Sequence, residues 1–263
     1  MPPEPAELRP TIDRSWLEGA ERSDPIAHAY ALWDLDRFPD RVRFVSALVG
    51  GRPVGYLLCW EVPDHLPVVQ WMAPPIPELA TALPSRPLRV NAPAYAAALV
   101  RSARAPCTEQ PLLLESAPLG IPLPATPFDG RVRRIEREDA ATLYALARSV
   151  PDEMAASYVG LDPGAEAIFG GFDGRQLVAV ARASVRRPSV WFVSGVFVRP
   201  EFRGRGWGKA VARAVVMAAR SAGASAALYV REARADARAA YEGLGFRPVD
   251  RRILLDCGSP DAP

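Results

Sequence analysis

The feature that most constrains this chain is a glycine-rich turn, RGRGWGK at residues 203–209, between a strand pattern and a helix pattern. An apolar segment at 191–198 precedes it, and an alanine-rich segment at 209–220 follows it. The first N–H groups of a helix have no partner within the helix and carry partial positive charge. Glycines also let a ligand approach the backbone closely. The stretch therefore predicts a binding site for a phosphate or pyrophosphate.

The spacing of the glycines distinguishes three kinds of phosphate-binding loop. A Walker A loop needs Ser or Thr after its lysine, whereas Ala210 follows Lys209 here. A dinucleotide-binding loop needs G-x-G-x-x-G and, about 20 residues later, an acidic residue that ends the next strand. The sequence offers neither feature. The pattern R-x-x-G-x-G does fit, with Arg203, Gly206 and Gly208.

The loop and its flanks resemble the acetyl-CoA signature of the GCN5-related N-acetyltransferase (GNAT) superfamily. The sequence V-x-V-x-P-E-F-R-G begins at Val196, and A-Y-E-G-L-G-F occupies 240–246, so the match spans 193–249 in order and spacing. The resemblance implies an α/β fold, with a mixed sheet whose fourth and fifth strands splay apart to admit acetyl-CoA.

Composition indicates a globular protein without a charged macromolecular partner. The chain has 263 residues, of which 49% are hydrophobic and 24% charged, and this suits two domains of ordinary size. A net charge of +2 argues against nucleic acid or an anionic membrane as the main partner. Apolar runs stay well below the ~20 residues of a membrane helix. Residues 1–10 lack the apolar core of a signal peptide. We therefore expect a cytoplasmic monomer or homodimer.

Cysteine and histidine are too sparse to indicate a disulfide framework or a metal site. The three cysteines, Cys59, Cys107 and Cys257, are scattered, and Cys59 lies in an apolar run typical of a core strand. The two histidines, His28 and His65, stand far from the glycine-rich loop in the sequence. We expect no bound metal.

Proline divides the chain into two parts. Prolines and glycines crowd residues 117–130, which carry almost no charge, and this indicates an extended and fairly stiff linker. We expect an N-terminal domain at 1–120, a proline-rich linker at 121–130 and a catalytic domain at 131–263.

The C-terminal part reads as an α/β domain. Apolar runs predict strands, and amphipathic or alanine-rich runs, two of them followed by Gly223 and Gly245, predict helices. A second short helix or a loop is expected at 151–159. The expected strands are 132–135, 167–172, 176–184, 191–198, 226–230, 246–249 and 252–256, and the expected helices are 138–149, 209–220 and 235–244. This is the element order that the GNAT resemblance implies.

The N-terminal part repeats that order more weakly. Strands are expected at 43–49, 54–61, 67–72 and 110–115, with helices following Asp24 and at 91–103. Between 72 and 91, prolines stand where R-x-x-G-x-G would be. We interpret the N-terminal part as a degenerate GNAT-like domain that binds no cofactor, as in tandem proteins that resemble glycine N-acyltransferase. An unrelated α/β domain is the alternative.

The residues expected to hold acetyl-CoA surround the loop. Its backbone N–H groups and positive charges would bind the pyrophosphate, and the residues that do so are Arg203, Gly204, Arg205, Gly206, Trp207, Gly208 and Lys209. Resemblance implies that Val196, Phe197 and Val198 pair with the pantetheine chain, and that the Val198 N–H polarises the thioester. Lys209 is the only lysine in the chain, so it is either functional or simply tolerated in an arginine-biased sequence.

Resemblance also places Tyr241 beside the cofactor sulfur, where a phenol can protonate the leaving thiolate. The alternative role of Tyr241 is packing between helix and sheet. Many relatives carry a Glu on the strand before the loop as the base, but Ser194 stands in that region and could relay a proton through water. Asp152 and Glu153 are weaker candidates. Arg234 occupies a position where relatives often have an Asn that contacts the cofactor.

These observations predict an acetyl-CoA-dependent N-acetyltransferase that transfers acetyl directly to a primary amine of a small molecule or peptide. One alternative keeps the reaction but uses a longer or aromatic acyl-CoA. A further alternative is a non-catalytic acyl-CoA sensor, which the missing base and Arg234 would suit.

Overall fold

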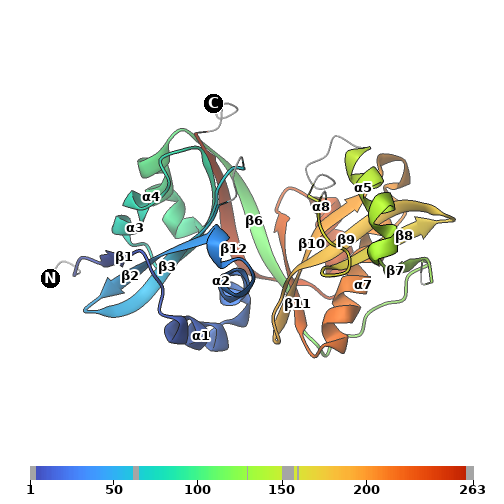
Figure 1. The fold of residues 1–263 in the computed structure, drawn as a ribbon, viewed down its shortest axis with the longest axis horizontal. Coiled ribbons are helices and arrows are strands. Elements are labelled where there is room, and N and C mark those ends of the chain that lie inside the picture. Colours follow the sequence, from blue (N-terminus) through green and yellow to red (C-terminus); the bar gives the residue numbers. More distant parts are fainter. Residues whose placement is uncertain (1–3, 62–64, 129, 150–156, 159, 259–263) are drawn as a thin grey trace. The chain divides into compact units, whose positions relative to one another are not determined.

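The computed structural model describes residues 4–61, 65–128, 130–149, 157–158 and 160–258. By their contacts, the residues form two compact units (Figure 1). Unit 1 consists of Met1–Leu113, Arg231–Ala233 and Asp250–Pro263, and unit 2 consists of Leu114–Val230 and Arg234–Val249. Residues 250–258 thus belong to the unit built mainly from the N-terminal part. The domain limits expected from the sequence stay a prediction.

Unit 1 is a sheet with helices on both faces. Its strands are β1 (Glu7–Arg9), β2 (Val42–Val49), β3 (Arg52–Trp60), β4 (Val68–Met72), β5 (Leu88–Pro93), the last part of β12 (Arg247–Cys257) and the first part of β6 (Cys107–Ala117), in that spatial order. β4 and β5 are parallel, whereas β5 and β12 are antiparallel. The helices are α1 (Arg14–Ser23), α2 (Pro25–Arg37), α3 (Pro77–Thr81) and α4 (Ala94–Arg104), with a 3₁₀ turn η1 (Pro39–Arg41).

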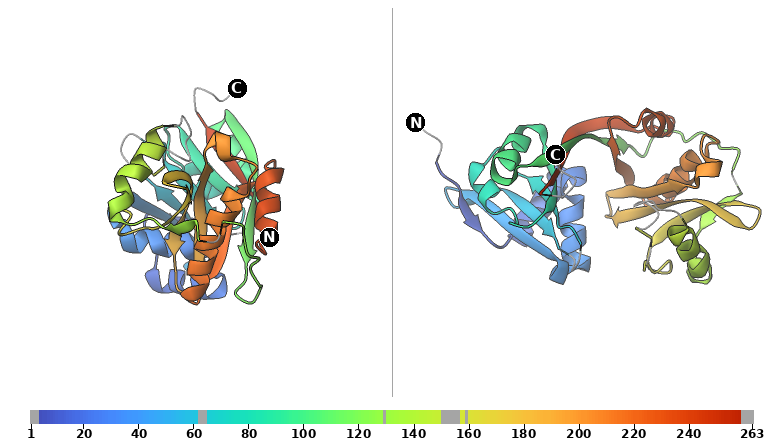
Figure 2. Two further views of the ribbon diagram at one scale, coloured as in Figure 1. Left: turned by 90° about the vertical axis from the view of Figure 1, so that its right-hand side faces the viewer. Right: turned by 90° about the horizontal axis from the view of Figure 1, so that it is seen from above.

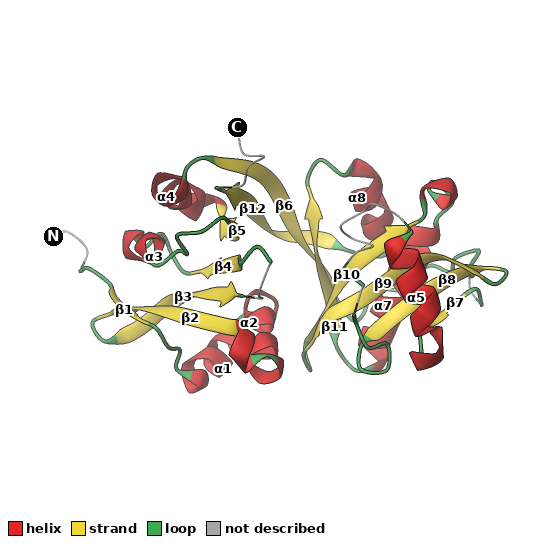
Figure 3. Cartoon of the chain, turned by 45° about the horizontal axis from the view of Figure 1, so that its top comes forward, coloured by secondary structure: helices red, strands yellow, loops and turns green. Residues whose placement is uncertain are grey.

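Each face of the unit 1 sheet has its own core. Helices α3 and α4 cover one face, where Trp71, Leu79 and Val100 are buried together. Helices α1 and α2 cover the other, where Leu17 and Tyr56 are completely buried (Figure 3).

Three sequence expectations for this unit need correction. The helix expected at 91–103 is in fact β5 followed by α4, because Leu88, Val90 and Ala92 alternate into the core and the helix starts only after Pro93. The strands expected at 246–249 and 252–256 are one strand, β12. Strand β1 and helix α1 were not predicted, although Asp13 accepts two backbone hydrogen bonds as the N-cap of α1.

Unit 2 is a second mixed sheet. Its strands are the last part of β6, β11 (Ser225–Arg231), β10 (Val190–Val198), β9 (Gln176–Arg186), β8 (Ala167–Asp173) and β7 (Val132–Arg134), in that spatial order. Its helices are α5 (Ala140–Arg148), α7 (Trp207–Ser221) and α8 (Ala235–Glu242), with 3₁₀ turns η2 (Arg137–Asp139) and η3 (Pro200–Phe202). Helix α5 lies on one face of the sheet, and α7 and α8 lie on the other (Figure 2). The predicted α/β class with a mixed sheet is confirmed.

The proline-rich segment packs along α7. Two arginines of that helix hold it: Arg213 Nε donates to the Pro124 carbonyl at 2.7 Å, and Arg220 donates to the carbonyls of Pro118 and Ile121. Phe128 then stacks on Trp207, with ring centroids 3.9 Å apart. The segment expected to be a linker therefore also supports the first turn of α7.

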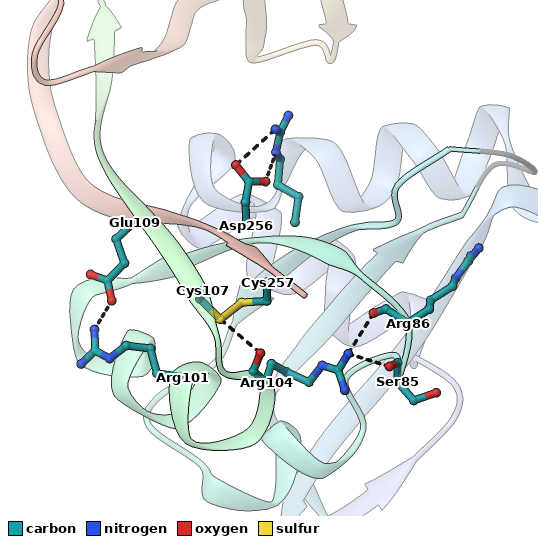
Figure 4. The surroundings of a disulfide bond; sticks show 9 residues. Ser85, Arg86, Arg101, Arg104, Cys107, Glu109, Asp256 and Cys257 are labelled. Carbon is teal, nitrogen blue, oxygen red and sulfur yellow. Dashed lines mark hydrogen bonds and ion pairs between the residues drawn. A yellow bond between two sulfur atoms is a disulfide. The ribbon is translucent and has the colours of Figure 1, made fainter. Parts of the chain in front are cut away.

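Two cysteines form a disulfide, contrary to the sequence expectation. Cys107 at the start of β6 is bonded to Cys257 at the end of β12, 150 residues later (Figure 4). Beside it, Arg89 forms an ion pair with Asp256 through Nε at 2.6 Å. Sequence spacing could not reveal this pair, because only the pairing of β12 in the unit 1 sheet brings the two residues together. Cys59 is free and buried, as expected.

Candidate active site

The candidate site begins where β10 and β11 stop pairing. In their parallel register, Val190 pairs with Ser225, Trp191 with Ala226 and Phe192 with Ala227. Strand β10 nevertheless continues to Val198, and β11 continues to Arg231. Beyond Phe192, the facing edges of these strands therefore have backbone groups that do not pair with any strand of the described residues. An extended amide chain can bind such an edge as an added strand does.

A β-bulge lies at the start of this opening. The β9–β10 register shifts between Ser194 and Phe197, and Gly195 has φ +62°. A β-carbon at Gly195 would lie 2.6 Å from the Tyr158 hydroxyl, which itself donates to the Gly195 carbonyl at 2.6 Å. Glycine is thus required both by conformation and by space.

The bulge sends neighbouring side chains to different faces. Val196 and Val198 face α7, because a β-carbon at Gly208 would contact them at 3.8 and 3.4 Å. Phe197 is buried in the core beneath α5. The Arg199 N–H donates to the Val178 carbonyl on β9. Since successive N–H groups of a strand alternate in direction, the Val198 N–H points toward the opening.

The glycine-rich loop ends at the first turn of α7. Gly206 is the N-cap residue with φ +90°, a conformation that favours glycine, and no side chain of the described residues caps this helix. The first N–H groups of α7 are therefore available to an anion. Arg203 Nε donates to the Val198 carbonyl at 3.1 Å, and the Arg205 guanidinium lies 5.3 Å from the Phe202 ring. Trp207 is buried and fixes the turn against the sheet.

Two predicted cofactor residues have local structural contacts. The Lys209 amine lies against Gly243 at the end of α8, within 2.6 Å of the place a β-carbon would take. That position suits a cation near a helix C-terminus. Arg234 pairs with Asp236 in the first turn of α8, at 3.0 Å from each carboxylate oxygen. Their cofactor roles stay predictions.

Tyr241 lies on α8 against Phe246, with ring centroids 5.9 Å apart. Burial raises the pKa of Tyr241 to about 12; the Arg234 charge works against this shift and Glu115 adds to it. The phenol is therefore protonated at neutral pH. Ser194 Oγ is buried and has no hydrogen-bond partner among the described residues. Asp152 and Glu153 lie outside the described residues.

Glu115 is an acidic residue that the sequence reasoning missed. It lies on β6 with 4% of its surface exposed, and its Oε2 has no hydrogen-bond partner among the described residues. Burial raises the pKa of this carboxyl, and the nearby Arg238 opposes that shift. The signal available in the sequence was a lone carboxylate in the apolar run 112–117.

Unit 1 has a corresponding parallel pair, but its opening is filled. The last pair in the β4–β5 register is Gln70 with Asn91. The next residue on β4 is Trp71, and its carbonyl accepts a hydrogen bond from Arg252 Nη2 at 2.8 Å. Arg252 is buried and also donates to the Asn91 side chain and carbonyl. The chain's own guanidinium thus satisfies the backbone groups that an added ligand would need.

The described residues show no group of three or more His, Cys, Asp or Glu side chains placed to hold a metal ion. In the same part of the chain, no helix has the length and apolar character needed to cross a membrane.

Solved structures with the same fold cover nearly the whole chain. A Drosophila protein has 14% identity and a TM-score of 0.72, with 95% of this chain and 98% of that chain covered. A tandem GNAT protein from the clavulanic acid biosynthesis pathway has 19% identity and a TM-score of 0.59, with coverage of 97% and 99%. A GCN5-related N-acetyltransferase from Kribbella flavida has 18% identity and a TM-score of 0.61, with coverage of 89% and 95%.

These likenesses establish the fold over both units, including the tandem GNAT-like arrangement. Among curated proteins, none matches the chain by sequence. The model of the acetyltransferase (GNAT) family matches residues 133–246, which include the opening, the loop of α7 and Tyr241. An acyl-CoA-dependent N-acetyltransferase activity goes with this family. The chain therefore carries a GNAT acetyltransferase domain at residues 133–246.

Proposed function

We propose that this protein transfers acetyl from acetyl-CoA directly to a primary amine of a small molecule or peptide. The observation that carries the proposal is in unit 2, where β10 and β11 stop pairing beyond Phe192 and the glycine-rich start of α7 follows β10. Tyr241 on α8 interacts electrostatically with Tyr158, which bonds the Gly195 carbonyl at the bulge. An anion site, an edge for an amide chain and a proton donor are the three features that this reaction needs.

The residues present fit acetyl-CoA. The N–H groups from Gly206 onward, with Arg203 and Arg205 beside them, suit the pyrophosphate. The free edge at Val196 to Val198 suits the amides of pantetheine. When bound, acetyl-CoA supplies the acetyl group as an activated thioester.

Three groups of this chain have assignable roles in the transfer. The Val198 N–H, directed into the opening, hydrogen-bonds the thioester oxygen and stabilises negative charge on it. Ser194 would relay a proton: its Oγ receives the proton that the attacking amine loses while its own hydroxyl proton passes to a water molecule, which is the final acceptor. Tyr241 donates its proton to the departing sulfur and regains one from solvent. Direct attack forms the C–N bond as the C–S bond breaks, so no cysteine is required.

The proposal is tested by product analysis. Purified protein is incubated with acetyl-CoA and a panel of primary amines, and mass spectrometry detects acetylated product. Octanoyl-CoA and benzoyl-CoA run in parallel, and Gly206→Val is the matched inactive control. We expect acetylated amine with wild type and none with the variant. If octanoyl-CoA or benzoyl-CoA reacts faster than acetyl-CoA, the group that the protein transfers is that acyl group and not acetyl. Binding without product from any amine would instead favour an acyl-CoA sensor.

A further inference from the structure

We propose that the amine acceptor carries a carboxylate a few atoms from its amine, and that Arg182 on β9 binds this carboxylate. The inference rests on the proposed function and adds the class of acceptor. Its basis is an arginine beside the bulge that has no anionic partner in the described structure.

Arg182 faces the side of the sheet opposite the α7 loop. On β9 it follows Val180 by two residues, and Val180 is buried with Tyr158 and Phe197 beneath α5. Side chains two residues apart on a strand share a face. The Arg182 guanidinium carbon lies 5.9 Å from the centroid of the Tyr158 ring. Tyr158 in turn bonds the Gly195 carbonyl, so Arg182 stands at the bulge.

Two buried polar atoms at this place have no hydrogen-bond partner among the described residues. They are Arg182 Nε and Ser194 Oγ, and Arg182 and Ser194 are direct cross-strand partners. No described carboxylate pairs with Arg182. Several other arginines of unit 2 are engaged, for example Arg133 with Asp139 and Arg186 with the Ala165 carbonyl. A partly buried cation without a counterion costs free energy, which an anionic ligand would recover.

The spacing of the two residues selects the kind of acceptor. Side chains of cross-strand partners start about 5 Å apart. An amine beside Ser194 would be next to the bulge, where the thioester is expected, and a carboxylate beside Arg182 would be one strand away. Arginine recognises carboxylates through two parallel N–H···O bonds. A free amino acid, with its amine and carboxylate separated by one to a few atoms, matches this arrangement.

The test compares amino acids with their carboxamides. Acetylation rates are measured by CoA release for a panel of free amino acids, the matching amino-acid amides and O-phosphoethanolamine. For the best acceptor, we expect kcat/KM for the acid to exceed that for its amide at least tenfold. Arg182→Met should abolish this preference by lowering kcat/KM for the acid much more than kcat/KM for the amide. Arg182→Lys keeps the positive charge but cannot make two parallel hydrogen bonds to a carboxylate, so it should retain part of the preference.

Arg186→Met is the matched control, because Arg186 lies on the same strand and should not affect the preference. Calorimetric titration with acetyl-CoA shows that each variant is folded and that its cofactor site is intact. The inference is wrong if acid and amide react equally in wild type, if Arg182→Met lowers both equally, if O-phosphoethanolamine is preferred, or if no amino acid reacts. Each of these results with acetyl-CoA still bound overturns only this inference, whereas loss of binding in wild type overturns the proposed function.

Discussion

At the scale of single residues, burial sets the acid–base properties of the site. Tyr241 has its pKa raised to about 12 because burial disfavours the phenolate. The folded state therefore holds the Tyr241 proton more tightly than the unfolded chain does, so folding stability depends on pH. The stability gained in this way is complete below the ordinary tyrosine pKa near 10 and is lost as the pH rises toward 12. A donor with this pKa is fully protonated wherever acceptor amines react.

Replacement of Tyr241 by Phe tests the donor role. We expect kcat to fall at least tenfold with little change in the affinity for acetyl-CoA, because only the departing sulfur uses the hydroxyl. In wild type, kcat should show no alkaline loss attributable to Tyr241 until the pH nears 12. CoA release, followed by stopped-flow or steady-state kinetics across the pH range, measures kcat for wild type and variant. Calorimetric titration measures the affinity for acetyl-CoA. An unchanged kcat in the variant would leave Tyr241 only a packing role.

Gly195 is a second residue whose role can be measured. Gly195→Ala places a β-carbon 2.6 Å from the Tyr158 hydroxyl, in a backbone conformation with φ +62°. We expect the free energy of unfolding to fall by about 1–3 kcal/mol. In a Tyr158→Phe background the loss should be smaller, because the clashing oxygen is absent, so a double-mutant cycle shows coupling. Strict additivity in chemical denaturation would refute the contact.

At the scale of elements, the site is built from four consecutive elements and from neighbouring strands that come from distant parts of the sequence. The order β10, α7, β11, α8 could be predicted because each element has a strong pattern and the glycine loop marks the start of α7. β5 was missed because Asn91 and Pro93 interrupt its apolar pattern. Glu115 and Arg182 escaped notice because their significance comes from strand neighbours, β11 for one and β10 for the other, and these are tertiary pairings.

The disulfide between β6 and β12 gives a prediction at this scale. Cys257→Ser opens a ring of 150 residues, and the unfolded chain should gain conformational entropy. We expect the free energy of unfolding to fall by about 2–4 kcal/mol. Urea denaturation with and without dithiothreitol measures the change, and the reductant should no longer affect the variant. Equal stability of oxidised wild type and variant would contradict the prediction. Disulfides persist in oxidising compartments and are rare in a reducing cytoplasm. The disulfide therefore does not favour the cytoplasmic location expected from the sequence, and that location stays a prediction.

At the scale of the whole molecule, the two units use similar sheets differently. Unit 2 begins α7 with glycines and leaves the edges of its parallel pair without a described partner strand; the exposed Arg203 binds the Val198 carbonyl at the end of β10. Unit 1 fills the corresponding place with the buried Arg252 and begins the short α3 at Pro77, without glycines. We therefore expect unit 2 alone to bind acetyl-CoA. The sequence already indicated this through prolines in place of glycines, but the buried arginine comes from β12 and could be recognised only in the structure.

Isothermal titration with acetyl-CoA tests the central claim most directly, because it counts the working cofactor sites. Wild type should bind one acetyl-CoA per chain, and Gly206→Val should bind none, because a branched side chain cannot adopt the φ of +90° at this N-cap. Circular dichroism confirms that the variant is folded. Two binding events per chain, no binding by wild type, or full binding by folded Gly206→Val would contradict the account.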